Sequence, residues 1–172
     1  VGVYRVAAQG ALLVSLGLSA LNMLVAPYIT NLHAHGEFMK LQKLSRRTAQ
    51  ASLAIAVPTV LGFFIFGEKL LVTIFGEAFS AAWLPLLILG LGQIANAGFG
   101  SVGLLLNMTG YERDVTRIVA LAAVLNVLLN LVAIPAFGIN GAAAATSISL
   151  VLWNVLLWRL VHRRLGIRCS AI

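Results

Sequence analysis

The sequence predicts an all-α integral membrane protein with five transmembrane helices. Of its 172 residues, 60% are hydrophobic and 10% are charged, and the mean hydropathy is +0.99. A soluble domain carries about 25% charged residues, so the polar residues cannot cover a water-exposed surface. Long stretches without any charge are the second observation. Together they exclude both a soluble globular domain and a disordered chain, which needs low hydrophobicity and high charge.

The charge-free stretches set the number of predicted helices. About 20 residues cross the hydrocarbon core of a bilayer, so the first three stretches hold one crossing each and the fourth holds two. Within the fourth stretch, residues 135–141 read PAFGING, a proline- and glycine-rich sequence that favours a helix break and a tight turn. The stretches cover residues 6–32, 48–67, 78–111 and 118–158. We therefore expect membrane helices near 7–32, 48–66, 83–107, 117–135 and 141–161.

A shorter element is predicted between the second and third crossings. Leu71, Ile74 and Phe75 recur at helical spacing beside charged residues, a pattern typical of a helix that lies in the membrane interface. The segment is too short to span a bilayer. The sequence therefore predicts a short interfacial helix near 68–76.

Basic residues are distributed unequally between the connecting segments. Ten of the 12 lysines and arginines fall in alternate segments, and Arg5 and Lys69 fall in the others. The ten are Lys40, Lys43, Arg46, Arg47, Arg113, Arg117, Arg159, Arg163, Arg164 and Arg168. Cytoplasmic loops of membrane proteins carry the excess of basic residues, so we expect a multi-pass protein with a cytoplasmic C-terminus. The net charge of +7 is explained by this topology, and no nucleic-acid partner is expected.

Neutral polar residues are the candidates for a functional site, because the four charge-free stretches contain no Asp, Glu, Lys, Arg or His. Asn126 and Asn130 are four residues apart and therefore share one face of a helix, and Gln93 and Asn96 are three apart. Such amides either line a substrate cavity or hydrogen-bond to neighbouring helices. Nothing in the sequence indicates catalytic residues, a metal site or a cofactor, and membrane lipids are the expected surroundings.

Three segments match sequence patterns of one family of membrane proteins. The chain opens with VGVYRVA, similar to a G-x-Y-x-x-A sequence at the start of a span, and residues 75–82 read FGEAFSAA, similar to F-G-x-x-F-x-x-A. The most specific match is residues 126–146, NVLLNLVAIPAFGINGAAAAT, which resembles the penultimate hairpin of that family. These three segments resemble polysaccharide exporters of the multidrug/oligosaccharidyl-lipid/polysaccharide superfamily, and the resemblance extends over essentially the whole chain.

This resemblance implies a function and an architecture. Residues 1–172 would be the C-terminal transmembrane domain of an O-antigen or teichoic-acid type flippase, forming most of one lobe of a two-lobe bundle, with the N-terminal lobe absent from the sequence. Such a protein is not an enzyme. It would move a lipid-linked oligosaccharide or polysaccharide precursor across the bacterial inner membrane by alternating access.

Two other functions remain open at the level of the sequence. A multidrug or cation antiporter of the same superfamily would need an ionisable coupling residue within a span. A membrane-embedded glycosyl- or acyltransferase would need a carboxylate or histidine at the membrane boundary, and the acidic residues Glu68, Glu77, Glu112 and Asp114 have no partner constellation there. His33 and His35 are expected in a solvated loop rather than at a metal site.

Overall fold

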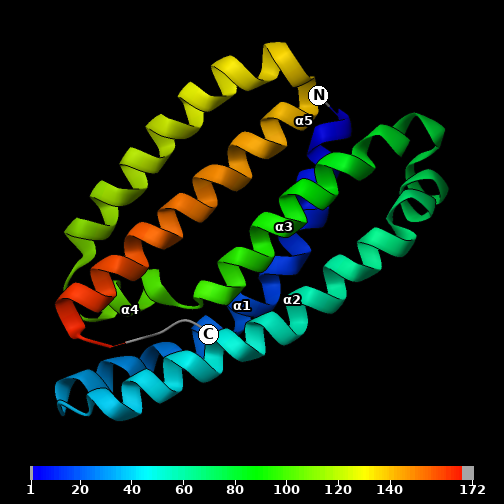
Figure 1. The fold of residues 1–172 in the computed structure, drawn as a ribbon. Helices are drawn as coiled ribbons and strands as arrows, with labels where there is room; N and C mark the ends of the chain where they lie inside the picture. Colours follow the sequence, from blue (N-terminus) through cyan, green and yellow to red (C-terminus); the bar gives the residue numbers. More distant parts are fainter. Residues whose placement is uncertain (1, 168–172) are drawn as a thin grey trace.

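A computed structural model describes residues 2–167 of the chain, and this part is helical with no β-strand (Figure 1). The single cysteine, Cys169, and the basic residue Arg168 lie outside the described residues. The elements are α1 (Gly2–Ala34), α2 (Phe38–Phe75), a 3-10 helix (Glu77–Ala82), α3 (Trp83–Phe99), α4 (Val102–Met108) and α5 (Glu112–Leu165).

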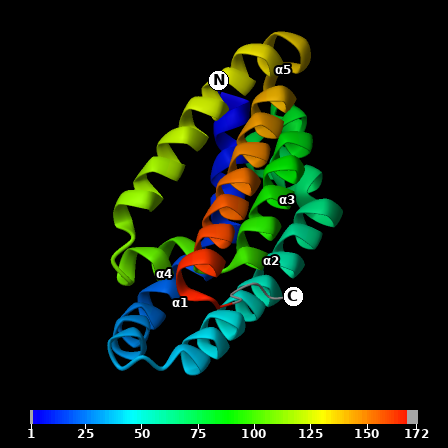
Figure 2. The same cartoon turned by 60° about the vertical axis from the view of Figure 1, so that its left-hand side comes forward.

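The longest helix, α5, is folded back on itself at Gly138. This glycine has φ 57° and ψ −134°, a conformation that is essentially restricted to glycine. We call residues 112–137 the first arm and residues 139–165 the second arm. Asp114 lies near the start of the first arm and Arg164 near the end of the second, and Asp114 Oδ2 is 3.5 Å from Arg164 Nη2. The two ends of α5 therefore meet, and the arms run side by side (Figures 1 and 2).

The helices pack as a bundle with the first arm of α5 at its edge. In both views the second arm lies between the first arm and α3, while α3 packs on α1 and α2 (Figure 2). Contacts are close where glycine faces a neighbouring helix. A Cβ on Gly92 of α3 would lie 3.2 Å from the Cα atom of Ser147 on the second arm, and the Ser147 hydroxyl donates to the Ile88 carbonyl at 2.9 Å. Small residues thus allow the backbones of α3 and α5 to approach each other.

Two predicted helices are wrong, and one predicted break is confirmed. The predicted interfacial helix near 68–76 is not a separate element, because α2 continues without interruption to Phe75. The last turns of α2 leave the line of its earlier turns (Figure 1). The predicted third span, 83–107, is two helices that are separated at Gly100. The helix break predicted within residues 135–141 is confirmed, and it is confined to one non-helical residue, Gly138, since Asn140 and Gly141 are helical.

Gly100 breaks the predicted third span for two physical reasons. Its φ is +66°, a value that L residues with a side chain rarely adopt. A Cβ at this position would also lie 2.7 Å from the Cβ of Ala49 and 3.2 Å from its Cα. The glycine therefore both turns the chain and lets it pass close to α2.

Four helical stretches among residues 2–167 are long and apolar enough to cross a membrane. They are Gly2–Ala34, Phe38–Phe75, Glu77–Phe99 and Glu112–Leu165. The sequence predicts five crossings, and the difference arises at α5, where helical structure continues on both sides of the kink and joins two predicted spans. Large apolar side chains are exposed over the outside of the bundle, among them Met23 at 81% and Val132 at 75% exposure. These features define a multi-pass helical membrane protein.

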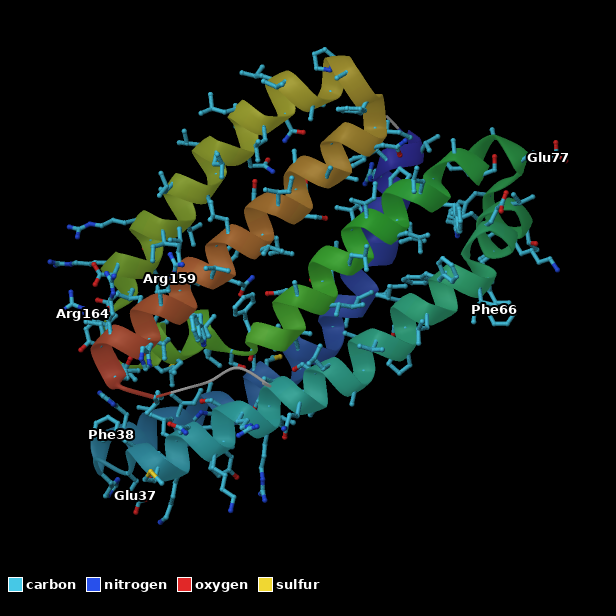
Figure 3. All side chains as sticks on the ribbon, viewed as in Figure 1. Glu37, Phe38, Phe66, Glu77, Arg159 and Arg164 are labelled. Atoms are coloured by element: carbon cyan, nitrogen blue, oxygen red, sulfur yellow. The ribbon has the colours of Figure 1, made fainter. Side chains whose placement is uncertain are left out.

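Basic residues from the start of α2 and from both ends of α5 lie at one end of this bundle. Figure 3 places Arg159 and Arg164 at the same end as Glu37 and Phe38, where α1 gives way to α2, whereas Glu77 lies at the opposite end. Arg164 holds the two ends of α5 together there. It pairs with Asp114, and its guanidinium lies 5.4 Å from the centre of the Tyr111 ring. The unequal distribution of charge in the sequence therefore corresponds to two ends of the folded chain.

Candidate functional site

Gln93 and Asn96 of α3 belong to a chain of hydrogen-bonded amides that reaches the second arm of α5. The Asn154 amide donates to Asn96 Oδ1 at 3.0 Å, and the Asn96 amide donates to Gln93 Oε1 at 3.2 Å. Asn154 is 3% exposed and also donates to the Leu150 carbonyl at 2.9 Å. A buried amide needs such partners, because an unpaired polar group in an apolar interior costs about 1–3 kcal/mol. These three residues therefore join α3 to α5.

Asn126 and Asn130 lie together on the first arm, as their spacing predicts. The Asn130 amide donates to the Asn126 carbonyl at 2.8 Å and to Asn126 Oδ1 at 3.0 Å. The Asn126 amide in turn donates to Ser149 Oγ on the second arm at 3.3 Å. Asn126 thus connects the two arms, and Asn130 holds the Asn126 side chain in place.

Two adjoining cavities lie among these polar residues. The smaller one, which we call the upper cavity, has a volume of about 290 Å³ and lies between the two arms of α5 and α3. Gln93, Asn126, Thr146 and Ser149 supply its polar lining. The larger one, the lower cavity, has a volume of about 380 Å³. Its polar lining comprises Ser15, Ser19, Asn22, Asn96, Ser101, Asn107, Trp153 and Asn154.

The four predicted site residues are divided between these cavities. Gln93 and Asn126 line the upper cavity and Asn96 lines the lower one. Asn130 is not among the lining residues of either, and its contact with Asn126 places it behind the upper cavity. Val119 and Trp153 line both cavities, so the two spaces meet at this pair.

Several residues of the lower cavity were not singled out from the sequence. Ser15, Ser19 and Asn22 of α1 recur at intervals of four and three residues, which places them on one helix face. That spacing was the available signal. Ser101 could not be found in this way, because it lies at the break after Gly100, where its hydroxyl donates to Asn22 Oδ1. The break at Gly100, which the sequence did not predict, therefore brings the Ser101 hydroxyl to the lower cavity.

The indole of Trp153 is placed where the two cavities meet. Its Nε1 atom is buried and has no hydrogen-bond partner among residues 2–167. An indole N–H only donates, and a buried donor is normally paired. Trp153 therefore lines both cavities and carries a buried N–H donor that no described residue satisfies.

Polar and apolar side chains both line the two cavities, and the polar groups among them are uncharged. Amide groups both donate and accept hydrogen bonds, and serine and threonine hydroxyls do the same. None of the described residues that line either cavity is ionisable. This arrangement suits a neutral ligand with many hydroxyl groups, such as a sugar.

The chain is thus a multi-pass helical membrane protein with a neutral polar site between its helices. It is similar to two proteins of the archaeon Haloferax volcanii that are named as flippases. One is the probable low-salt glycan biosynthesis flippase Agl15, 26% identical over 156 residues, covering 91% of this chain and 33% of the relative. The other is the probable flippase AglR, 26% identical over 159 residues, with the same coverage of 91% and 33%.

Both relatives are named as probable flippases, and the name of Agl15 also gives glycan biosynthesis. The chain spans about a third of the length of the curated relatives that it matches. No family model and no solved structure matches it.

Proposed function

We propose that these residues form the C-terminal transmembrane domain of a flippase that moves a lipid-linked glycan precursor across the plasma membrane. The similarity to two named flippases over 91% of the chain is the observation that carries the proposal. The missing N-terminal lobe of the same protein would form the other side of the transport pathway. The cargo itself would be a lipid-linked oligosaccharide, as the resemblance to polysaccharide exporters implies.

In this proposal the cavities receive the sugar part of the cargo. Sugar hydroxyls would replace the hydrogen bond between Asn126 and Ser149 and would also bind Gln93, since all three residues line the upper cavity. The first arm lies at the edge of the bundle (Figure 2), so it is the element whose movement would open or close that cavity during alternating access. The kink at Gly138 would serve as its pivot.

We further propose that α5 crosses the membrane twice, which gives five crossings in all. Each arm contains more than the roughly 20 residues that a crossing needs, and the ion pair between Asp114 and Arg164 keeps their ends on one side. The basic end would face the cytoplasm. Single-cysteine variants of the full-length protein test this: labels at Arg47→Cys and Phe137→Cys should be reached from opposite sides. Labelling of both from one side would end the five-crossing topology.

The proposal leaves open which glycan is carried and whether the cell is bacterial or archaeal. The resemblance predicts an O-antigen or teichoic-acid type of cargo and a bacterial inner membrane, and both stay predictions. The two relatives belong to an archaeon. The proposal therefore names the plasma membrane and a lipid-linked glycan, and no particular sugar.

The cavity role is tested by replacing both Asn126 and Asn130 with alanine in the full-length protein. Glycan export should fall while most of the protein remains in the membrane, because the helices keep their other contacts. Gln50→Ala is the matched control, since Gln50 is an exposed amide on α2 that lines neither cavity. The cavity role is wrong if export and abundance fall together, or if neither changes.

A further inference from the structure

A groove at the basic end of the bundle lies apart from the two polar cavities. It is formed where the last turns of α1 meet the first turns of α2, and its volume is about 280 Å³. Its lining combines basic, neutral polar and apolar side chains: Tyr28, Asn31, Leu32, Lys40, Lys43, Leu44 and Arg47. None of these residues lines either polar cavity.

The three cations of this groove occupy one face of α2. Lys40, Lys43 and Arg47 are separated by three and four residues, the spacing that aligns side chains along one side of a helix. Arg46 lies next to Arg47 in the chain but does not line the groove. The cations are thus turned toward α1 rather than spread evenly around α2.

The groove carries more positive than negative charge. Lys40 Nζ lies 2.8 Å from Glu37 Oε2. Within residues 2–167, no carboxylate oxygen lies within 4.0 Å of the charged nitrogens of Lys43 or Arg47. Three cations therefore face one carboxylate, and the charge on Lys43 and Arg47 is available to an anion.

The position of the groove indicates what kind of anion fits. The charge-free stretch of α1 ends at Leu32 and that of α2 begins at Thr48, so the groove lies where apolar helix gives way to charge. Leu32 and Leu44 provide apolar surface beside the cations. Basic pockets between membrane helices bind the phosphate head groups of lipids, and arginine pairs well with phosphate oxygens.

We propose that this groove binds the phosphate head group of an anionic membrane lipid. Lys43 and Arg47 pair with the phosphate oxygens, the Asn31 amide and the Tyr28 hydroxyl donate hydrogen bonds to the head group, and the acyl chains extend along the apolar surface next to Leu32 and Leu44. The site is independent of the transport cavity. It concerns lipid in the leaflet at the basic end, whichever cargo the protein carries.

The test is a lipid titration of the purified full-length protein in detergent, followed by native mass spectrometry. The probes are phosphatidylglycerol, which is anionic, and phosphatidylcholine, which carries no net charge. The variant Lys43→Gln/Arg47→Gln removes two charges from the groove. The variant Arg46→Gln/Arg113→Gln removes two charges from the same end but outside the groove, and serves as its control.

We expect phosphatidylglycerol to bind the unmodified protein more tightly than phosphatidylcholine. The groove variant should lose roughly tenfold or more of this affinity, as two charges beside a lipid phosphate imply, and the control should lose only a few-fold. Equal losses of phosphatidylglycerol affinity in both variants would show general attraction to a basic surface and would overturn the assignment of the lipid to the groove. No loss in either variant would do the same.

A competition with inorganic phosphate separates a lipid site from a site for free phosphate. Phosphate added in excess should leave bound phosphatidylglycerol in place, because it lacks the acyl chains that contact the apolar surface. Displacement of the lipid would overturn the assignment to a membrane lipid. Variants at Lys43 and Arg47 should fold normally, since both side chains are exposed.

Discussion

Gly141 is the position at which a single methyl group should most disturb the fold of α5. A Cβ there would lie 2.6 Å from the carbonyl carbon of Ala133 and 3.2 Å from its Cβ, and it would also overlap the Ala133 carbonyl oxygen. These are mainly backbone atoms on the other arm, so no side-chain rotation relieves the overlap. Overpacking of this kind costs about 1–3 kcal/mol. Gly141→Ala should therefore separate the two arms near the kink, and Gly141→Leu should do so more severely.

The loss of stability in Gly141→Ala must be compared with that of a control glycine-to-alanine variant. Alanine is a better helix former than glycine by about 1 kcal/mol, and this gain offsets part of the cost of the overlap. Gly62→Ala in α2 is that control, since no atom lies within 4 Å of a Cβ built there and its φ is not positive. The difference between the two variants isolates the overlap with Ala133. We expect Gly62→Ala to raise or preserve thermal stability and Gly141→Ala to lower it.

The assay is the melting temperature and the membrane abundance of the full-length protein, measured in parallel for both variants. A Gly141→Ala protein as stable as Gly62→Ala would refute the close contact between the arms. Normal stability of Gly141→Leu together with lost transport would instead show that Gly141 acts directly in function.

Three further predictions use the polar contacts. Trp153→Phe removes the unpaired indole N–H of a residue that lines both cavities and should lower glycan export at normal abundance. Trp158→Phe should leave export unchanged, because Trp158 lines neither cavity although its buried Nε1 also has no partner among residues 2–167. Equal export by both variants would contradict a role for the Trp153 donor. Asn154→Leu leaves Asn96 Oδ1 without its donor and should lower the free energy of unfolding by about 1–3 kcal/mol, whereas an unchanged melting temperature would show that the amide chain adds no stability. Asp114→Asn breaks the partly exposed, 3.5 Å pairs of that carboxylate and should cost about 0–1 kcal/mol, and a larger loss would mean that joining the ends of α5 is essential.

The sequence is sufficient to predict helices and membrane character because both depend on composition and on where charges are absent. It also predicts the face that Asn126 and Asn130 share, since that follows from helical periodicity alone. Helix breaks are different. Pro135 and the Asn140–Gly141 pair are strong local signals for a helix break. The backbone turns at Gly138 instead, which is the residue with a positive φ within 135–141.

The residues that line the two cavities were predictable only in part, because the cavities depend on how helices far apart in the sequence pack. The polar residues of α1 carry a readable spacing, but their meeting with Asn154 depends on how α1, α3 and α5 pack. Gly100 shows this most clearly. Its contact with Ala49 is made across 51 residues of sequence, and that contact sets the position of Ser101 beside Asn22. No local pattern contains this information.

The central claim is that the full-length protein moves lipid-linked glycan through a neutral polar site. The most direct measurement reconstitutes it in vesicles that hold a lipid-linked oligosaccharide and follows the glycan's exposure to an added lectin. We expect lectin binding at the outer leaflet to rise as the unmodified protein moves glycan outward from the inner leaflet. It should rise far more slowly with Asn126→Ala/Asn96→Ala, which alters one amide in each cavity. Exposure at the rate of protein-free vesicles would contradict the flippase, and an unchanged rate in the variant would contradict the site.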